Sequence, residues 1–159
     1  MSHEMSPSTR RVLTVLQEKS LADNVVFLPD STHTAAAAAA ALGCEVAQIA
    51  KSIVFRAKRT DRAVLVVASG TNRVDTKRIG ALLGEPLEKA DAEFVRERTG
   101  FAIGGVSPVG HTGPVETFVD EDLFQHEVIW AAAGTSHAVF SMAPADAVTL
   151  TGGRVVTIK

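Results

Sequence analysis

Two short segments of the 159-residue chain carry residue types that can bind a ligand or assist a reaction. In residues 49–55, Lys51 lies near the start of an otherwise apolar run that is typical of a buried strand. A lysine there either points to solvent or is held at the end of a sheet as a fixed positive charge. In residues 104–110, two consecutive glycines allow backbone N–H groups to approach a ligand closely, and Pro108 stiffens the loop. This loop either binds a carbonyl or hydroxyl oxygen or forms a tight corner between two elements.

The other reactive residue types form no recognisable site. The five histidines include no i, i+4 pair and no Cys/His cluster at metal-ligand spacing, which argues against a metal site. Cys44 is the only cysteine, which excludes an internal disulfide and a multi-thiolate metal site. No base lies beside Cys44 in the sequence, which favours a small buried residue over a nucleophile. The nucleophile elbow of hydrolases, the phosphate loop and the dinucleotide fingerprint are absent.

The length and composition predict one globular domain without a membrane segment. A chain of 159 residues can bury a core without disulfides or metals, and 46% hydrophobic residues exclude a disordered chain. The longest apolar stretch, residues 35–42, is far shorter than the roughly 20 residues that cross a bilayer. Residues 1–11 lack the basic start and apolar core of a signal peptide, so a cytoplasmic location is expected.

Charge is distributed unevenly along the chain, whose formal net charge is −2. Residues 51–78 contain eight basic and two acidic residues, whereas residues 99–153 contain six acidic residues and neither Lys nor Arg. The basic third either steers a polyanion to one face of the protein or consists of solvated side chains at strand edges and turns. The charge pattern alone does not decide between these interpretations.

The pattern of apolar residues, caps and glycines predicts interspersed helices and strands. Thr34 can cap a helix of seven alanines and Leu42, which Gly43 ends. The expected helices and helical turns are residues 8–19, 35–42, 46–50, 76–83 and 92–98, with further turns starting at Asp120 and Pro144. The expected strands are residues 25–28, 51–56, 63–69, 115–119, 128–132, 138–142 and 155–158, with a charged hairpin tip at 57–62. Without regular βαβ alternation, the fold class is α+β with a mixed, mostly antiparallel sheet.

Several of these residues stand in an order that resembles one known family, the YbaK/prolyl-tRNA synthetase-associated domain family. The resemblance covers residues 25–150. The matching features are Thr34 with its alanine helix, residues 48–52, residues 104–108, and Gly134 followed by His137. The resemblance implies a single α+β domain spanning residues 1–159, built around a barrel-like sheet flanked by helices. It also implies a free-standing, trans-editing hydrolase that deacylates mischarged aminoacyl-tRNA, in particular tRNA(Pro) carrying alanine or cysteine.

The resemblance also implies roles for individual residues. Lys51 matches the key lysine of the family, and His137, after Gly134, matches a histidine near the amino-acid pocket. The glycine-rich loop of the family corresponds to Gly104, Gly105, Val106, Ser107 and Pro108. The cysteine-specific branch has a tyrosine in the neighbourhood of Phe27 and an aspartate where Val139 stands. The sequence therefore favours alanine or another small residue over cysteine.

The chemistry expected of these residues is hydrolysis of an already activated ester without a metal or a cofactor. Lys51 would anchor the terminal nucleotide through phosphate or ribose contacts, while N–H groups of residues 104–107 would hold the ester carbonyl. Water would attack with proton help from the neighbouring ribose hydroxyl, since no side-chain base is evident. His137 is expected to line the pocket, with general-base and purely structural roles as alternatives. Thr34 and Phe27 belong to the helix and the strand that are expected to wall the pocket.

The expected partner is the acceptor end of aminoacyl-tRNA, with prolyl-tRNA synthetase as a further partner and no membrane or metal. Four basic residues are expected to contact acceptor-stem phosphates through salt-sensitive interactions. These residues are Arg56, Lys58, Arg59 and Arg73. Two other function classes stay open at this point: a non-catalytic module that docks on tRNA or a synthetase, and an esterase for small acylated nucleotides.

Overall fold

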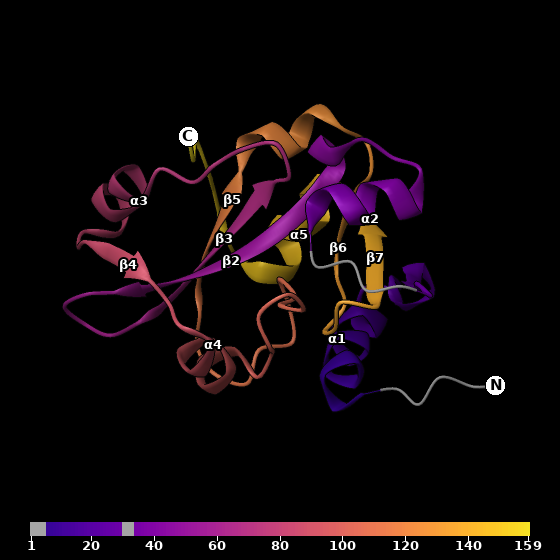
Figure 1. Cartoon of the computed structure of the whole chain (residues 1–159), viewed down its shortest axis with the longest axis horizontal. Coiled ribbons are helices and arrows are strands. Elements are labelled where there is room, and N and C mark those ends of the chain that lie inside the picture. Colours follow the sequence, from indigo (N-terminus) through magenta and orange to yellow (C-terminus); the bar gives the residue numbers. More distant parts are fainter. Residues whose placement is uncertain (1–5, 30–33) are drawn as a thin grey trace.

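The computed structural model describes residues 6–29 and 34–159, whose helices and strands are shown in Figure 1. The α-helices are α1 (Pro7–Glu18), α2 (Ala35–Leu42), α3 (Thr76–Leu83), α4 (Ala92–Thr99) and α5 (Pro144–Thr151). The 3-10 helices are η1 (Ala22–Asn24), η2 (Val46–Gln48) and η3 (Glu121–Gln125). The strands are β1 (Val25–Phe27), β2 (Ile49–Ala57), β3 (Ala63–Ser69), β4 (Leu87–Lys89), β5 (Glu116–Asp120), β6 (Ile129–Ala132), β7 (Ala138–Met142) and β8 (Arg154–Val156). No helix in these described ranges is long and apolar enough to cross a membrane.

Local capping residues set the ends of α2, α3 and α4. The Thr34 hydroxyl accepts a hydrogen bond from the backbone N–H of Ala37 at 3.0 Å, and Asp75 and Asp91 cap the next two helices similarly. Gly43 ends α2 with a φ of 68°, a left-handed conformation that glycine adopts at little cost. The predicted positions of these three helices are confirmed to within one residue.

Eight strands form one mixed sheet. Their order is β1-β7-β6-β2-β3-β5-β8, and β4 pairs with β2 off this path. Four pairings are antiparallel and three are parallel, which confirms the predicted mixed, mostly antiparallel sheet of an α+β fold. The two end strands of the order, β1 and β8, do not pair with each other in the described part of the chain. The sheet is therefore open and does not close into a barrel.

Two details of the sheet differ from the sequence prediction. A helical turn is predicted over residues 46–50, but η2 ends at Gln48 because the next two residues pair in parallel with β6. The strand β4 is absent from the prediction, since two of its three residues are charged and none is β-branched or aromatic. The earlier start of β2 makes Lys51 the third residue of the strand.

The two faces of β2 pack against different elements, because alternate side chains of a strand point to opposite faces of a sheet. On one face, Ile49 packs with residues of α2, and Phe55 packs in a cluster with residues of α3. On the other face, Ala50 and Val54 belong to the main core. Lys51 therefore shares its face of β2 with both α2 and α3.

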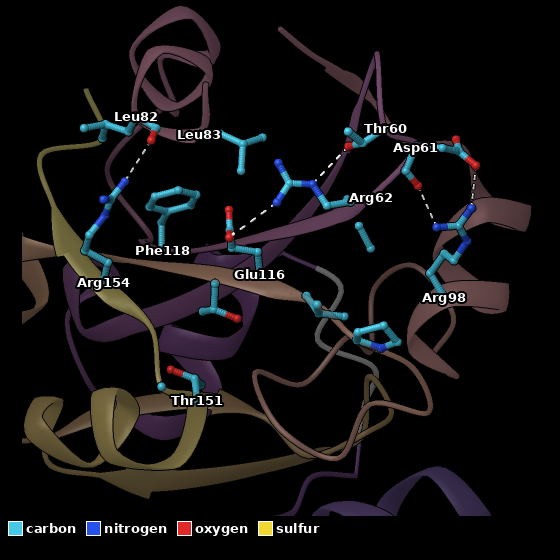
Figure 2. Close-up of a pocket in the computed structure, with 15 residues that line it drawn as sticks. Thr60, Asp61, Arg62, Leu82, Leu83, Arg98, Glu116, Phe118, Thr151 and Arg154 are labelled. Carbon is cyan, nitrogen blue, oxygen red and sulfur yellow. Dashed lines mark hydrogen bonds and ion pairs between the residues drawn. The ribbon is translucent and has the colours of Figure 1, made fainter. Parts of the chain in front are cut away.

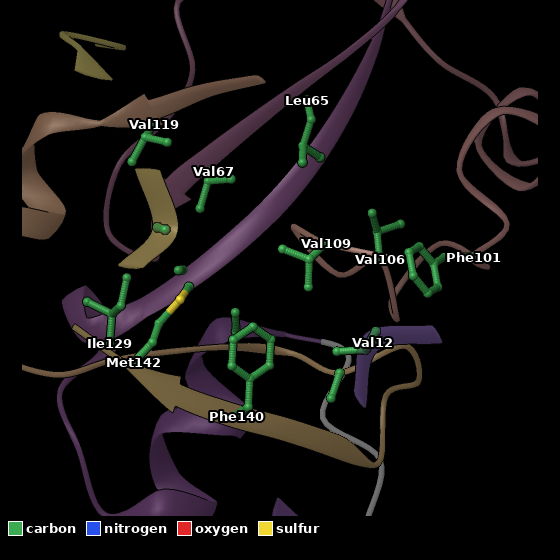
Figure 3. Close-up of a cluster of buried hydrophobic side chains, with 14 of the residues drawn as sticks. Val12, Leu65, Val67, Phe101, Val106, Val109, Val119, Ile129, Phe140 and Met142 are labelled. Carbon is green, nitrogen blue, oxygen red and sulfur yellow. The ribbon is translucent and has the colours of Figure 1, made fainter. Parts of the chain in front are cut away.

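The main core holds the glycine-rich loop against the sheet (Figure 3). Val106 and Val109 of the loop are only 7% and 4% exposed, and they share a cluster with Leu65 of β3 and Phe140 of β7. Phe101, just before the loop, is fully buried in the same cluster. These three buried side chains fix the position of the loop backbone between them.

Glu85 fastens the tip of the β2–β3 hairpin. Its carboxylate accepts hydrogen bonds from the backbone N–H groups of Arg59 and Thr60 at 2.9 Å, and from the Thr60 hydroxyl at 2.8 Å. A guanidinium nitrogen of Arg62 lies 3.1 Å from the same carboxylate. Desolvation raises the pKa of Glu85, but the hydrogen bonds from Thr60, Arg62 and Arg59 outweigh it and lower the pKa from 4.5 to about 2.

Protonation of Glu85 is therefore expected to destabilise the protein in acid. A lowered pKa in the folded state contributes stability that is present above the unfolded value of 4.5 and is lost as the pH falls toward about 2. In urea titrations, Glu85→Gln should lower the unfolding midpoint at neutral pH, and its difference from wild type should shrink in acid over this range. The exposed residue Glu97 provides the control Glu97→Gln, for which no such change is expected. A difference for Glu85→Gln that stays constant with pH would contradict this role.

Candidate functional site

A cavity of about 610 Å³ lies where β2 parts from β6. One edge of β2 pairs with β3, but the other edge pairs with β6 only at Ile49 and Ala50, and with β4 only from Phe55. Residues 51–54 consequently have no neighbouring strand on that edge in the described part of the chain. The cavity lies at this gap, and α2, β6 and the glycine-rich loop supply its remaining walls.

The cavity walls are largely apolar. Among the described residues that line it, Lys51 is the only charged one, and there is no carboxylate, imidazole or thiolate. The apolar lining residues are Ala35, Ala36, Ala38, Val46, Ile49, Ala50, Ile53, Ile103, Val106, Trp130, Ala131, Ala132 and Val139. Such a surface can hold a small apolar group. Apolar surroundings also strengthen the interaction between the single ammonium group and a charged or polar ligand.

Lys51 and the glycine-rich loop line this same cavity, although more than fifty positions separate them in the sequence. The Lys51 side chain is partly buried and lines the cavity with Gly104 and Val106. It forms no hydrogen bond or ion pair with any residue that the structure describes. Its ammonium group is therefore available to a polar or anionic ligand.

The close packing of the loop explains its glycines. A Cβ atom on Gly105 would lie 2.8 Å from the Cα atom of Thr135, so only glycine allows this approach. Gly104 has a φ of 96°, which also favours glycine. The Gly105 N–H donates to the Ala102 carbonyl at 3.0 Å, whereas the N–H groups of Gly104 and Val106 have no partner among the described residues. Two unpaired donors thus belong to residues that line the cavity, and the Gly105 amide is already used.

Ser107 and Pro108 form the buried part of the glycine-rich loop, and neither lines the cavity. The Ser107 hydroxyl accepts a hydrogen bond from the Val109 N–H at 3.3 Å. The Ser107 carbonyl lies 2.8 Å from Nε2 of His111. Burial lowers the pKa of His111 and outweighs the hydrogen bond to the Ser107 carbonyl, which raises it, while the positive charge of Arg11 also lowers it. A neutral imidazole that donates to Ser107 therefore holds the loop, a role that the sequence analysis did not identify.

Three further residues expected at the pocket lie outside the cavity lining, namely Phe27, Gly134 and His137. His137 is exposed, and Phe27 lies on the outer strand β1 with 38% of its surface exposed. Thr34 and Val139 do line the cavity. Gly134 shapes the turn before His137 with a φ of 98°, and a Cβ atom there would come within 2.8 Å of the backbone of α1.

The hydroxyl of Ser52 is a site feature that the sequence analysis missed. Its Oγ atom is buried and has no hydrogen-bond partner among the described residues, and Ser52 lines the cavity. A buried hydroxyl without a partner costs about 1–3 kcal/mol. A ligand that supplies the partner would recover this energy on binding. The sequence shows that a serine follows Lys51, but it does not show that the hydroxyl is buried without a partner among the described residues.

The four basic residues expected to bind phosphates fall into two groups. Arg56 pairs with Asp61, and the guanidinium of Arg59 donates to a backbone carbonyl at 2.8 Å. Arg56 is also roughly 16 Å along β2 from Lys51, at about 3.3 Å per residue. Lys58 and Arg73 are exposed, and their side chains have no partner in the described ranges.

A second cavity, of about 740 Å³, contains three arginines that all have partners within the protein (Figure 2). Arg62 lies 3.6 Å from Glu116, Arg98 pairs with Asp61, and Arg154 donates to a backbone carbonyl of α3 at 3.0 Å. These interactions neutralise or occupy the guanidinium groups. The cavity beside Lys51 is therefore the better candidate for a functional site.

The chain is similar to several known proteins. A solved structure of a proposed trans-editing enzyme for prolyl-tRNA synthetase has a TM-score of 0.89 and 46% sequence identity, over 98% of this chain and 99% of that one. The uncharacterised Bacillus subtilis protein YwhH is 28% identical over 139 residues, which cover 87% of this chain and 88% of YwhH. EbsC of Enterococcus faecalis, a proposed Cys-tRNA(Pro)/Cys-tRNA(Cys) deacylase, is 28% identical over 126 residues, 79% of this chain and 76% of EbsC.

The sequence model of the aminoacyl-tRNA editing domain matches residues 29–150, which include Lys51, Ser52 and the glycine-rich loop. The match covers most of the chain and confirms the resemblance found in the sequence. The chain belongs to the aminoacyl-tRNA editing domain family.

Proposed function

We propose that this chain acts as one unit, over residues 1–159, that hydrolyses mischarged aminoacyl-tRNA in trans. The observation that carries the proposal is that Lys51, Gly104 and Val106 line one apolar cavity, and that the amides of Gly104 and Val106 have no partner among the described residues. The similarity to a proposed trans-editing enzyme for prolyl-tRNA synthetase and to EbsC, a proposed Cys-tRNA(Pro) deacylase, supports the same activity and suggests tRNA(Pro) as the carrier.

The proposed reaction is hydrolysis of the ester between the amino acid and the terminal ribose. A water molecule attacks the carbonyl carbon, and the bond from that carbon to the ribose oxygen breaks. The water proton passes to the departing ribose oxygen with help from the neighbouring ribose hydroxyl, which leaves a free amino acid and a free tRNA end. The Gly104 and Val106 amides would stabilise the negative charge on the carbonyl oxygen, and Lys51 would hold the terminal nucleotide. None of these steps requires a side-chain base, in keeping with the described lining.

We further propose that the preferred amino acid is alanine or another small residue. Ala35, Ala36 and Ala38 of α2 form part of the apolar wall of the cavity. Val139 lines the cavity where the cysteine-specific branch has an aspartate, which supports a small apolar side chain over cysteine. The proposed partner is accordingly the acceptor end of tRNA(Pro), with prolyl-tRNA synthetase as the enzyme whose errors are corrected.

Replacement of Lys51 should abolish most of the activity without affecting the fold. We expect Lys51→Ala to lower kcat/KM about 100-fold, on the scale measured for lost electrostatic donors. Its melting temperature should stay close to wild type, because Lys51 has no internal partner in the described ranges. The assay measures release of amino acid from tRNA(Pro) charged with alanine, cysteine, serine, 2-aminobutyrate or proline, with the exposed Lys19→Ala as control. Binding of these tRNAs by wild type without turnover would overturn the proposal in favour of a non-catalytic module.

Replacement of Ser52 should separate activity from stability. Ser52→Ala removes a hydroxyl that has no partner among the described residues, so the free energy of unfolding should not fall. The proposed substrate supplies the missing hydrogen bond, so kcat/KM should fall about 10-fold. Ser52→Thr keeps the hydroxyl and should retain more activity. Ser69→Ala is the matched comparison, since its hydroxyl donates to the Ala47 carbonyl at 2.7 Å and its loss should destabilise the fold. Unaltered kcat/KM in Ser52→Ala would show that the hydroxyl does not contact the substrate.

A further inference from the structure

The basic residues between Lys51 and Arg78 differ in whether the protein already uses their charge. Arg56 and Arg62 have carboxylate partners, and Arg59 donates to a backbone carbonyl. Four others are exposed, and their side chains have no hydrogen bond or ion pair in the described part of the chain. These are Lys58, Arg73, Lys77 and Arg78, which we call the basic strip.

The members of the basic strip lie close together around the start of α3. Lys58 and Lys77 line the same shallow hollow of about 670 Å³, between the hairpin and α3. Arg78 follows Lys77 in the first turn of α3, and Arg73 lies in the loop that leads to this helix. The strip therefore joins the end of the hairpin to one side of α3.

The basic strip adjoins the candidate cavity. The loop that carries Arg73 begins at Gly70, which lines the cavity. The helix α3 packs on the face of β2 that also carries Lys51, because Phe55 shares a cluster with residues of α3. Phe55 is four residues from Lys51, or roughly 13 Å along the strand. Figure 1 shows α2 beside one end of β2 and α3 toward its hairpin end, so a ligand leaving the cavity toward α3 meets the strip.

The negative charges nearest to the strip have other partners. Asp75 is the only acidic residue between Gly70 and Gly84, and its carboxylate accepts hydrogen bonds from the first turn of α3 at 3.1 Å. The carboxylate of Glu85 is buried under the hairpin, where Arg62 lies 3.1 Å away.

Asp120 and Asp122 also lie near the strip, since both carboxylates accept hydrogen bonds at 2.8 Å from Asn72, the neighbour of Arg73. Asp122 is in turn paired with Lys159 at 3.0 Å. The four cations of the strip have no carboxylate partner of their own in the described part of the chain, so their charge is available to an anionic ligand.

We infer that the basic strip binds the sugar–phosphate backbone of the tRNA acceptor arm whose 3′ end occupies the cavity. This inference rests on the proposed function and names the surface that holds its substrate. Exposed cations without partners lose little on meeting phosphates, whereas Arg56 and Arg59 would first have to break internal contacts. Of the four residues that the sequence suggested, Lys58 and Arg73 remain in this surface, and Lys77 and Arg78 join them. Phosphate contacts position an RNA without reading its sequence.

The test compares two triple variants that remove the same net charge. One is Arg73→Ala/Lys77→Ala/Arg78→Ala, and the control is Arg10→Ala/Lys19→Ala/Arg96→Ala, which removes exposed cations elsewhere. Binding of uncharged tRNA(Pro) is measured at several NaCl concentrations. Loss of three phosphate contacts should lower the slope of log Kd against log salt by about 2–3, and weaken binding about 100-fold at 0.1 M salt. The control variant should bind like wild type.

Hydrolysis assays keep the two proposals distinguishable. Alanyl-adenosine carries no phosphate, so its hydrolysis reports on the cavity alone, and the ratio of kcat/KM for alanyl-tRNA(Pro) to that for alanyl-adenosine should fall in the strip variant. An equal salt slope and affinity in the strip and control variants would overturn the inference about the strip, whatever the hydrolytic activity. Tight, strip-dependent binding without hydrolysis of either ester by wild type would support the strip and overturn the deacylase proposal.

Discussion

The candidate site depends on one strand edge that two partners share. On the edge of β2 opposite β3, the first residues pair with β6 and the last residues pair with β4. Residues 51–54 are therefore without a neighbouring strand on this edge in the described part of the chain. An uncovered strand edge presents backbone hydrogen-bonding groups that a protein must cover or use. Here α2 and the glycine-rich loop approach it and leave about 610 Å³ of space. The cavity thus follows from the pairing of the sheet, and it presents Lys51 and Ser52 from a rigid strand.

The loop opposite this edge is rigid for different reasons. Val106 and Val109 anchor it in the core, and Gly105 lets it approach the turn at Thr135 more closely than any side chain would allow. Donors that stabilise a developing oxyanion are effective only when they are already in place, since reorientation would consume the energy gained. A loop without regular secondary structure can meet this requirement because buried side chains, rather than a hydrogen-bonded ladder, fix its backbone.

The range of each interaction decides how much of this architecture the sequence predicts. Helix ends are local, so Thr34 and Gly43 predict the limits of α2 correctly. The residue types of Lys51 and the glycine-rich loop are also visible in the sequence, together with the α+β class. Whether an amide, a hydroxyl or an arginine is free depends on partners far along the chain. The sequence therefore could not show that the Gly105 amide is occupied, that the Ser52 hydroxyl lacks a partner within the part of the chain that the structure describes, or that Arg56 is paired.

The separation of cavity and basic strip has a consequence for selectivity. Phosphate contacts contribute the same binding energy whatever amino acid the tRNA carries, so they raise affinity for every charged tRNA equally. Discrimination must then arise in the cavity, where one methylene changes the interaction by only about 1–3 kcal/mol. A cavity wall at a fixed position, such as the one that includes Ala35, Ala36 and Ala38, can discriminate by exclusion, which penalises a larger side chain without requiring tight binding of a small one. An editing enzyme built in this way can bind its carrier firmly and still leave correctly charged tRNA intact.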